Sequence, residues 1–173
     1  MAKRFICGAE KYEVGGPKED TIGLPVSFVG LPPSIEVEGH TLSLKTAFHV
    51  SLVCIGKIAE KNKLTDPDLV NKIVRDFCEF TSNTDVDLIR YRDDFRFATE
   101  AERRAVVVMC DISNLDKFFD LINQKYGLSL EYPPTHVTLY TLQPNVGIFL
   151  TDNDDIQQLT KQIERPTGIS SNL

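Results

Sequence analysis

The chain has 173 residues, of which 42% are hydrophobic and 25% charged, and its formal net charge is −6. This composition is typical of an ordinary globular domain, and the chain has no apolar run near the roughly 18 residues of a membrane span. The acidic balance disfavours tight binding of long nucleic acids, because that affinity comes from many Lys and Arg contacts to phosphates. We expect one cytoplasmic domain over residues 1–173, with no secretory signal and no membrane attachment.

The cysteines are widely spaced and form no CxxC pair, and most of them lie in apolar runs. This pattern predicts small buried thiols in a reducing compartment, rather than a disulfide framework or a zinc site. The four residues are Cys7, Cys54, Cys78 and Cys110.

In the first half of the chain, turn-forming residues predict a loop-rich stretch over 8–33 that encloses one strand at 24–30. A hairpin follows over 34–44 with its turn at Glu38-Gly39, and then an apolar strand over 47–55. A helix is expected from Thr65 or Asp66 onward, with Pro67 in its first turn. Its apolar positions have helical spacing: Leu69, Val70, Ile73, Val74 and Phe77.

In the second half, strands are predicted at 86–92, 94–99 and 105–112, and a helix is predicted from Ser113 or Asn114 to Gly127. Strands at 135–142 and 145–150 and a short helix within 152–163 complete the chain. Because hairpins and short connections mix with helices, we expect an α+β fold with helices packed on largely antiparallel sheets.

Two strands carry the same four-residue pattern of histidine, aliphatic residue, hydroxyl residue and leucine. The chain reads HVSL at 49–52 and HVTL at 136–139. Side chains i and i+2 share one face of a strand, so His49 lies with Ser51, and His136 lies with Thr138. The same alternation is expected to place Tyr140 on the face of His136.

An imidazole can take or give a proton near neutral pH, and a hydroxyl can donate to an anionic oxygen. Two such strands side by side would supply the groups that phosphodiester cleavage needs. One histidine would deprotonate the nucleophile, the other would protonate the leaving oxygen, and Ser51 and Thr138 would hold the phosphate. This chemistry requires no metal and no cofactor.

The two motifs resemble the signature motifs of the two-histidine (2H) phosphoesterase superfamily, which includes RNA 2′,3′-cyclic phosphodiesterases and 2′–5′ RNA ligase-like proteins. The resemblance implies a bilobal, pseudo-symmetric fold in which each lobe contributes one motif strand to a central cleft. It also implies metal-independent catalysis by His49 and His136. The expected substrate is a small nucleotide with a 2′,3′-cyclic phosphate, or a short or cyclic oligonucleotide with 2′–5′ or 3′–5′ linkages.

Other residues have two interpretations each. Tyr140 could stack on a base or bind phosphate, or it could be a partly buried tyrosine with its hydroxyl in solvent. Arg90 and Arg92 share a strand face and could hold a second phosphate of the ligand. The simpler interpretation is a solvated face with ion pairs to nearby carboxylates. His40 follows the predicted hairpin turn and is interpreted as an exposed turn or edge residue.

Two rival functions remain open from the sequence. The chain could be a nucleotide-binding or interaction domain that performs no chemistry, or a metallohydrolase that uses His40, His49 and nearby carboxylates. The sequence fixes neither which histidine is the acid nor the oligomeric state.

Overall fold

The computed structural model describes residues 3–173 and has an α+β fold. Its ten strands belong to one large, open, antiparallel sheet. The chain divides into two compact units, each of which is described by itself below. Unit 1 comprises Met1–Pro25, Ser51–Leu88 and Ile112–Pro133, and unit 2 comprises Val26–Val50, Ile89–Asp111 and Pro134–Leu173.

Unit 1 combines an antiparallel strand meander with three helices. The meander consists of β1 (Arg4–Ile6), β2 (Tyr12–Gly15) and β3 (Thr21–Val26). The helices are α1 (Ile55–Lys61), α2 (Leu69–Thr81) and α3 (Leu115–Tyr126).

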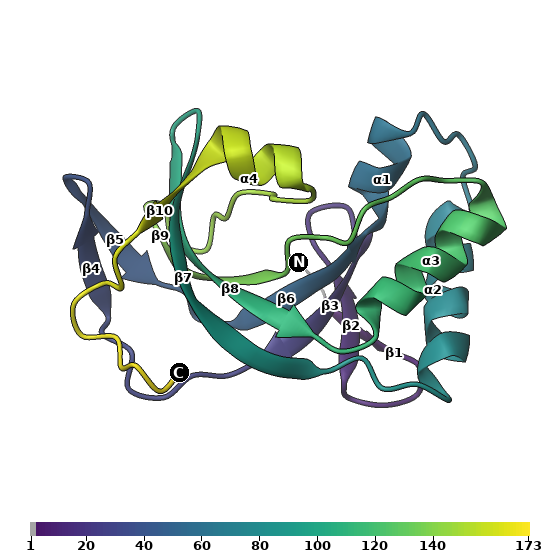
Figure 1. The fold of residues 1–173 in the computed structure, drawn as a ribbon, viewed down its shortest axis with the longest axis horizontal. Coiled ribbons are helices and arrows are strands. Elements are labelled where there is room, and N and C mark those ends of the chain that lie inside the picture. Colours follow the sequence, from purple (N-terminus) through teal and green to yellow (C-terminus); the bar gives the residue numbers. More distant parts are fainter. Residues whose placement is uncertain (1–2) are drawn as a thin grey trace. The chain divides into compact units, whose positions relative to one another are not determined.

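Helices α2 and α3 lie side by side and bury aromatic side chains between them and the meander (Figure 1). The ring of Phe77 contacts the rings of Phe118 and Tyr12 edge to face, with centroid separations of 5.2 and 4.9 Å. Buried Asp76 on α2 accepts hydrogen bonds from Lys125 and Tyr126 on α3, each at 2.6 Å. Apolar and polar contacts together therefore hold this helix pair.

The expectation of four free thiols is wrong for two of them, because Cys7 and Cys78 form a disulfide. The residue after β1 lies against the last turns of α2, with the two Cα atoms 4.9 Å apart. The sequence separation of 71 between the two cysteines hides this proximity in the sequence. Cys54 and Cys110 form no disulfide; Cys110 is buried, as expected, and burial raises its pKa to about 12, whereas Cys54 is half-buried.

Unit 2 is built from a twisted array of antiparallel strands. In this unit, β4 (Ser34–Val37) pairs with β5 (His40–Leu44), β5 pairs with β9 (His136–Thr141), and β9 pairs with β8 (Arg103–Ile112). The long strand β7 (Leu88–Glu100) pairs at its far end with β10 (Thr160–Ile163). Strand β6 (Phe48–Cys54) begins in this unit and pairs with β9.

One face of the unit 2 strands is covered by the segment after β9 and by α4 (Asn153–Leu159), which Figure 1 shows above β7. Side chains of β7, β8, this segment and α4 form a cluster there. Its members are Ala98, Ala105, Val107, Met109, Ile148, Leu150, Ile156 and Leu159. Asp152 caps the N-terminus of this helix, and its carboxylate accepts a hydrogen bond from the Asp155 amide.

Several predicted elements differ from the observed ones. The two strands expected at 86–92 and 94–99 are one strand, β7, so they do not pair with each other. Residues 145–150 form no strand, and the end of the expected last helix is strand β10. The predicted hairpin at 34–44, the strand at 47–55 and the helix that ends at Gly127 are confirmed.

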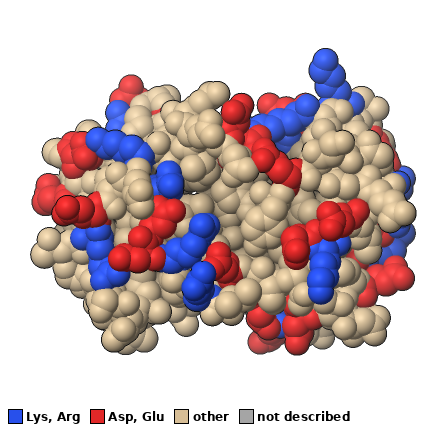
Figure 2. Space-filling model, in the orientation of Figure 1, with Lys and Arg blue, Asp and Glu red and all other residues tan. Residues whose placement is uncertain are grey.

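Charged side chains of both signs are interspersed over the face drawn in Figure 2, and they do not gather into one basic patch there. None of the helices in residues 3–173 has the length and apolar character needed to cross a bilayer.

Candidate functional site

The two histidine motifs lie on the neighbouring antiparallel strands β6 and β9, and the residues that pair belong to unit 2. Val50 of β6 lies opposite Val137 of β9. Continued by one residue, this register places His49 across from Thr138 on the other face of the strands. Both valines and Leu139 are fully buried, and Leu52 is only 1% exposed. The expected burial of the aliphatic residues of both motifs is confirmed.

The same register makes His49 and His136 diagonal neighbours across the strand pair. Diagonal positions in an antiparallel pair have Cα atoms about 7–8 Å apart, within reach of long side chains. Thr138 lies two residues from His136 on β9 and across from His49 on β6. We call the side of these strands that carries His49, His136 and Thr138 the motif face.

His136 is only 8% exposed, and a backbone carbonyl two residues earlier orients its ring. The Nδ1 atom lies 2.7 Å from the carbonyl oxygen of Pro134. Because a carbonyl oxygen can only accept, Nδ1 must carry the hydrogen. In the neutral ring, the lone pair is then on Nε2.

Burial lowers the pKa of His136 below the ordinary histidine value, and the positive charge of Lys45 acts in the same direction. The hydrogen bond to the Pro134 carbonyl opposes both effects. Lys45 follows β5 directly, and its amide donates to the Leu139 carbonyl at 2.9 Å, which holds it beside β9. His136 is therefore set up as a neutral imidazole with a free electron pair on Nε2, which is the form of a general base.

A loop after β9 passes over Thr138. Asn145 anchors one end of this loop, because its Oδ1 accepts hydrogen bonds from the amide and hydroxyl of Thr46, at 3.1 and 3.2 Å. Ile148 anchors the other end in the apolar cluster. Between the two anchors, a Cβ atom at Gly147 would lie 3.9 Å from the Thr138 hydroxyl oxygen. The position that a side chain of residue 147 would occupy is thus next to the hydroxyl of Thr138.

The expectation that Tyr140 shares the motif face is wrong, because β9 bulges after Thr138. Val107 and Val106 of β8 are consecutive, yet they lie opposite Thr138 and Tyr140, with Leu139 as the extra residue. The bulge turns Tyr140 to the opposite face and brings Thr141 onto the motif face.

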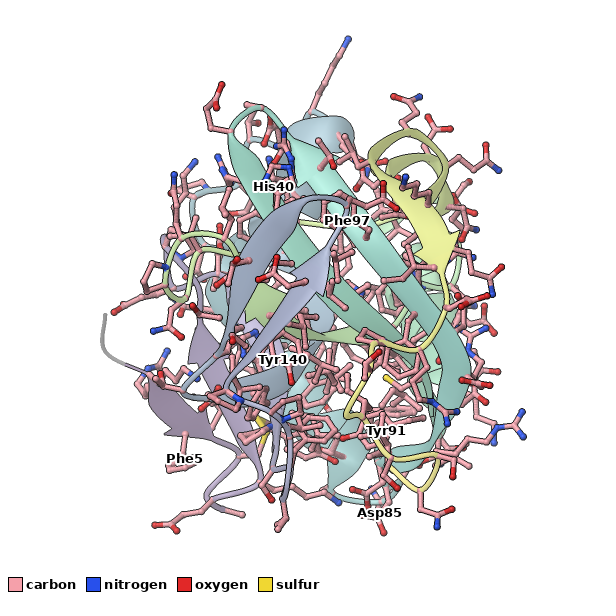
Figure 3. All side chains as sticks on the ribbon, turned by 90° about the vertical axis from the view of Figure 1, so that its left-hand side faces the viewer. Phe5, His40, Asp85, Tyr91, Phe97 and Tyr140 are labelled. Atoms are coloured by element: carbon pink, nitrogen blue, oxygen red, sulfur yellow. A yellow bond between two sulfur atoms is a disulfide. The ribbon has the colours of Figure 1, made fainter. Side chains whose placement is uncertain are left out.

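Tyr140 is fully buried, and its hydroxyl donates to the Pro32 carbonyl at 2.8 Å. Burial also raises the pKa of Tyr140 to about 12. Figure 3 labels Tyr140 within unit 2, together with His40, Tyr91 and Phe97. Tyr140 is therefore a core residue that is more buried than either interpretation from the sequence expected, and its hydroxyl bonds to the protein rather than to solvent.

Ser51 follows His49 by two residues on β6 and so points to the same side of that strand. It begins the part of β6 that belongs to unit 1.

His40 lies at the start of β5, half-buried, with its ring stacked on Phe97 at a centroid separation of 6.2 Å. Since Leu44 of β5 pairs with Tyr140, the alternate residue His40 lies on the face opposite to His49. Within residues 3–173, no three His, Cys, Asp or Glu side chains gather as a metal ion would require.

Arg90 and Arg92 lie on one face of β7, as predicted, and both contact Asp111 of β8. The distances from the two Nε atoms to the carboxylate oxygens are 2.7 and 3.4 Å. Other arginines of this stretch have the nearby partners that were expected, since Arg96 pairs with Asp94 and Arg103 with Glu100.

Three further residues beside the motifs escaped the sequence reasoning: Lys45, Asp111 and Gly147. Only Gly147 carries a local signal, because a glycine inside an apolar run often marks a close approach of the backbone. Lys45 and Asp111 reach their positions through strand pairing, which local sequence does not reveal. No protein-family model, no curated protein and no solved structure matches this chain.

Proposed function

We propose that this chain is a metal-independent phosphodiesterase of the 2H type, with His49 and His136 as its acid–base pair. The observation that carries the proposal is the pairing of Val50 with Val137, which places both histidines and Thr138 on one face of neighbouring strands. The bilobal, pseudo-symmetric arrangement of that superfamily belongs to the same proposal.

In the proposed reaction, the Nε2 atom of His136 accepts a proton from water as the water oxygen attacks phosphorus. The bond from phosphorus to a ribose oxygen breaks, and His49 donates a proton to that oxygen. Thr138, and by its place in the first motif Ser51, donate hydrogen bonds to the non-bridging phosphate oxygens. Water and a cyclic diester thus give a phosphate monoester, with one proton taken up and one released by the histidines.

The surroundings of His136 support its role as the base. A base needs a free electron pair, and the lowered pKa and the Pro134 contact leave one on Nε2 of His136. His49 is then the group left to protonate the leaving oxygen. The proposed substrate is a 2′,3′-cyclic phosphate or a short or cyclic oligonucleotide.

The alternative is a nucleotide-binding domain that performs no chemistry. Incubation of the protein with a panel of cyclic and 2′–5′-linked nucleotides in EDTA, read by mass spectrometry, separates the two. The proposal expects hydrolysis in chelator that is lost in His136→Ala, whereas binding without any product would favour the alternative. Activity that vanishes in EDTA and returns with a divalent ion would instead support a metallohydrolase.

A further inference from the structure

A pair of arginines on β7 is held by a single carboxylate on β8. Both Arg90 and Arg92 make their closest contact with Asp111 through Nε, and the Nε of Arg90 donates a hydrogen bond to this carboxylate. The side chains of Arg90 and Arg92 are 71% and 41% exposed. One carboxylate shared by two arginines leaves the group with a net positive charge.

This arginine pair lies on the motif face. Met109 of β8 pairs directly with His136, and Asp111 lies two residues further along the same strand. The register shift of β8 lies at Val106/Val107, before Met109. Side chains therefore alternate regularly from Met109 to Asp111, and these two residues share one face of β8. Asp111 and His136 are therefore diagonal neighbours, with Cα atoms about 7–8 Å apart.

The arrangement is poorly explained by fold stability alone. An exposed ion pair contributes at most about 1 kcal/mol, and one arginine would satisfy the Asp111 carboxylate. Two exposed guanidinium groups close together, each with terminal NH2 donors besides its Nε contact, form instead the donor set that a phosphate group prefers. Asp111 would act as a positioning residue that holds both groups by the Nε edge.

We propose that Arg90 and Arg92, oriented by Asp111, bind a second phosphate of the substrate next to the one that is cleaved. This inference rests on the proposed function and narrows it. The preferred substrate is an oligonucleotide that carries a further phosphate, such as a 5′-phosphorylated dinucleotide, rather than a mononucleoside 2′,3′-cyclic phosphate. Phosphate recognition by this pair is also expected to weaken with salt, since both side chains are exposed.

The test compares kcat/KM for two probes, a mononucleoside 2′,3′-cyclic phosphate and a dinucleotide with the same cyclic end and a 5′-phosphate. The Arg90→Gln/Arg92→Gln variant is expected to lose about tenfold or more on the dinucleotide and little on the mononucleoside. The matched control is Arg103→Gln/Arg104→Gln, which removes the same charge near the β7–β8 turn and is expected to leave both values unchanged. Arg90→Gln alone removes the more exposed arginine and keeps the Arg92–Asp111 contact, in case the double variant does not fold.

Equal losses on both probes, or an unchanged dinucleotide value, would overturn the second phosphate site while leaving the proposed function intact. A wild-type protein that hydrolyses neither probe would overturn the proposed function and the inference together.

Discussion

Val50 of β6 and Val137 of β9 lie opposite each other, fully buried, and this one pair sets the geometry of the candidate site. A shift of the register by one residue would turn one motif to the other face of the strands. The aliphatic residues inside each motif are therefore as important to the site as its histidines.

The first prediction concerns the acid limb of the pH–rate profile. Because burial and Lys45 lower the pKa of His136, its neutral form persists below the ordinary histidine value of about 6.5. We expect kcat/KM to stay high as pH falls through 6.5, and to decline only as pH passes the lowered pKa of His136. The free energy of unfolding should also fall as pH decreases, beginning near the ordinary histidine value of about 6.5. Between that value and the lowered pKa of His136, the unfolded chain binds a proton that the folded chain does not.

Replacement of Lys45 tests the electrostatic part of this account. Lys45→Met removes the positive charge, so the pKa of His136 should rise and the acid limb should move to higher pH. Lys161→Met is the matched control, because Lys161 pairs with Glu38 at the surface. An acid limb that stays in place in Lys45→Met, or moves equally in the control, would contradict the assigned effect of Lys45.

The second prediction concerns the hydroxyl of Thr138. Thr138→Val keeps the shape of the side chain and removes the donor to the phosphate. A hydrogen bond to a charged group is worth about 1.5–3 kcal/mol, so kcat/KM should fall by roughly 10- to 150-fold. Thr138→Ser keeps the hydroxyl and should retain most of the activity. If the valine and serine variants have equal rates, the hydroxyl does not bind the reacting group.

The third prediction concerns the space beside Gly147. Its φ is not positive, and an added Cβ would be at ordinary contact distance from Thr138, so alanine should be tolerated by the fold. In the proposed site, however, the methyl group of Gly147→Ala would stand where a phosphate oxygen approaches the hydroxyl. We expect a higher KM and an unchanged melting temperature.

Val146→Ala, in the same loop but at an exposed side chain, is the matched control for Gly147. A Gly147→Ala variant with wild-type KM would show that the phosphate does not approach Thr138 from this side.

The fourth prediction concerns the disulfide of unit 1. A crosslink that closes a loop of this length restricts the unfolded chain, and the chain-entropy relation gives about 4 kcal/mol. Cys7→Ser/Cys78→Ser should lower the free energy of unfolding by an amount of this order, measured by denaturant titration. Reductant should destabilise the wild-type protein and leave the double variant unchanged. Equal responses of the two proteins to reductant would argue against the bond.

Local sequence patterns predict the elements that have strong local signals. The hairpin at Glu38-Gly39 and the helix that ends at Gly127 form as expected, because a tight turn and a glycine C-cap are determined by neighbouring residues. The side chain of Asn114, in contrast, makes no capping hydrogen bond. Residues 145–150 were expected to form a strand, since they are apolar, but they pack as an irregular segment over the motif face. Their apolar pattern predicts that these residues are buried, but it does not predict which segment they pack against.

Long-range pairing limits what can be predicted of the site. The alternation within HVSL and HVTL correctly predicts which residues of each motif share a strand face. It fails at Tyr140, because the bulge after Thr138 depends on how β9 pairs with β8. The disulfide between Cys7 and Cys78 and the contacts of Asp111 are similar cases, in which distant segments meet through the fold.

The central claim is that His49 and His136 act together on one phosphorus centre, and a double-mutant cycle tests it most directly. The measurement is kcat/KM in EDTA for the wild-type protein, His49→Ala, His136→Ala and the double variant. We predict that each single variant loses about 100-fold or more, and that the double variant is little worse than the poorer single one. Wild-type activity in either single variant would contradict the claim.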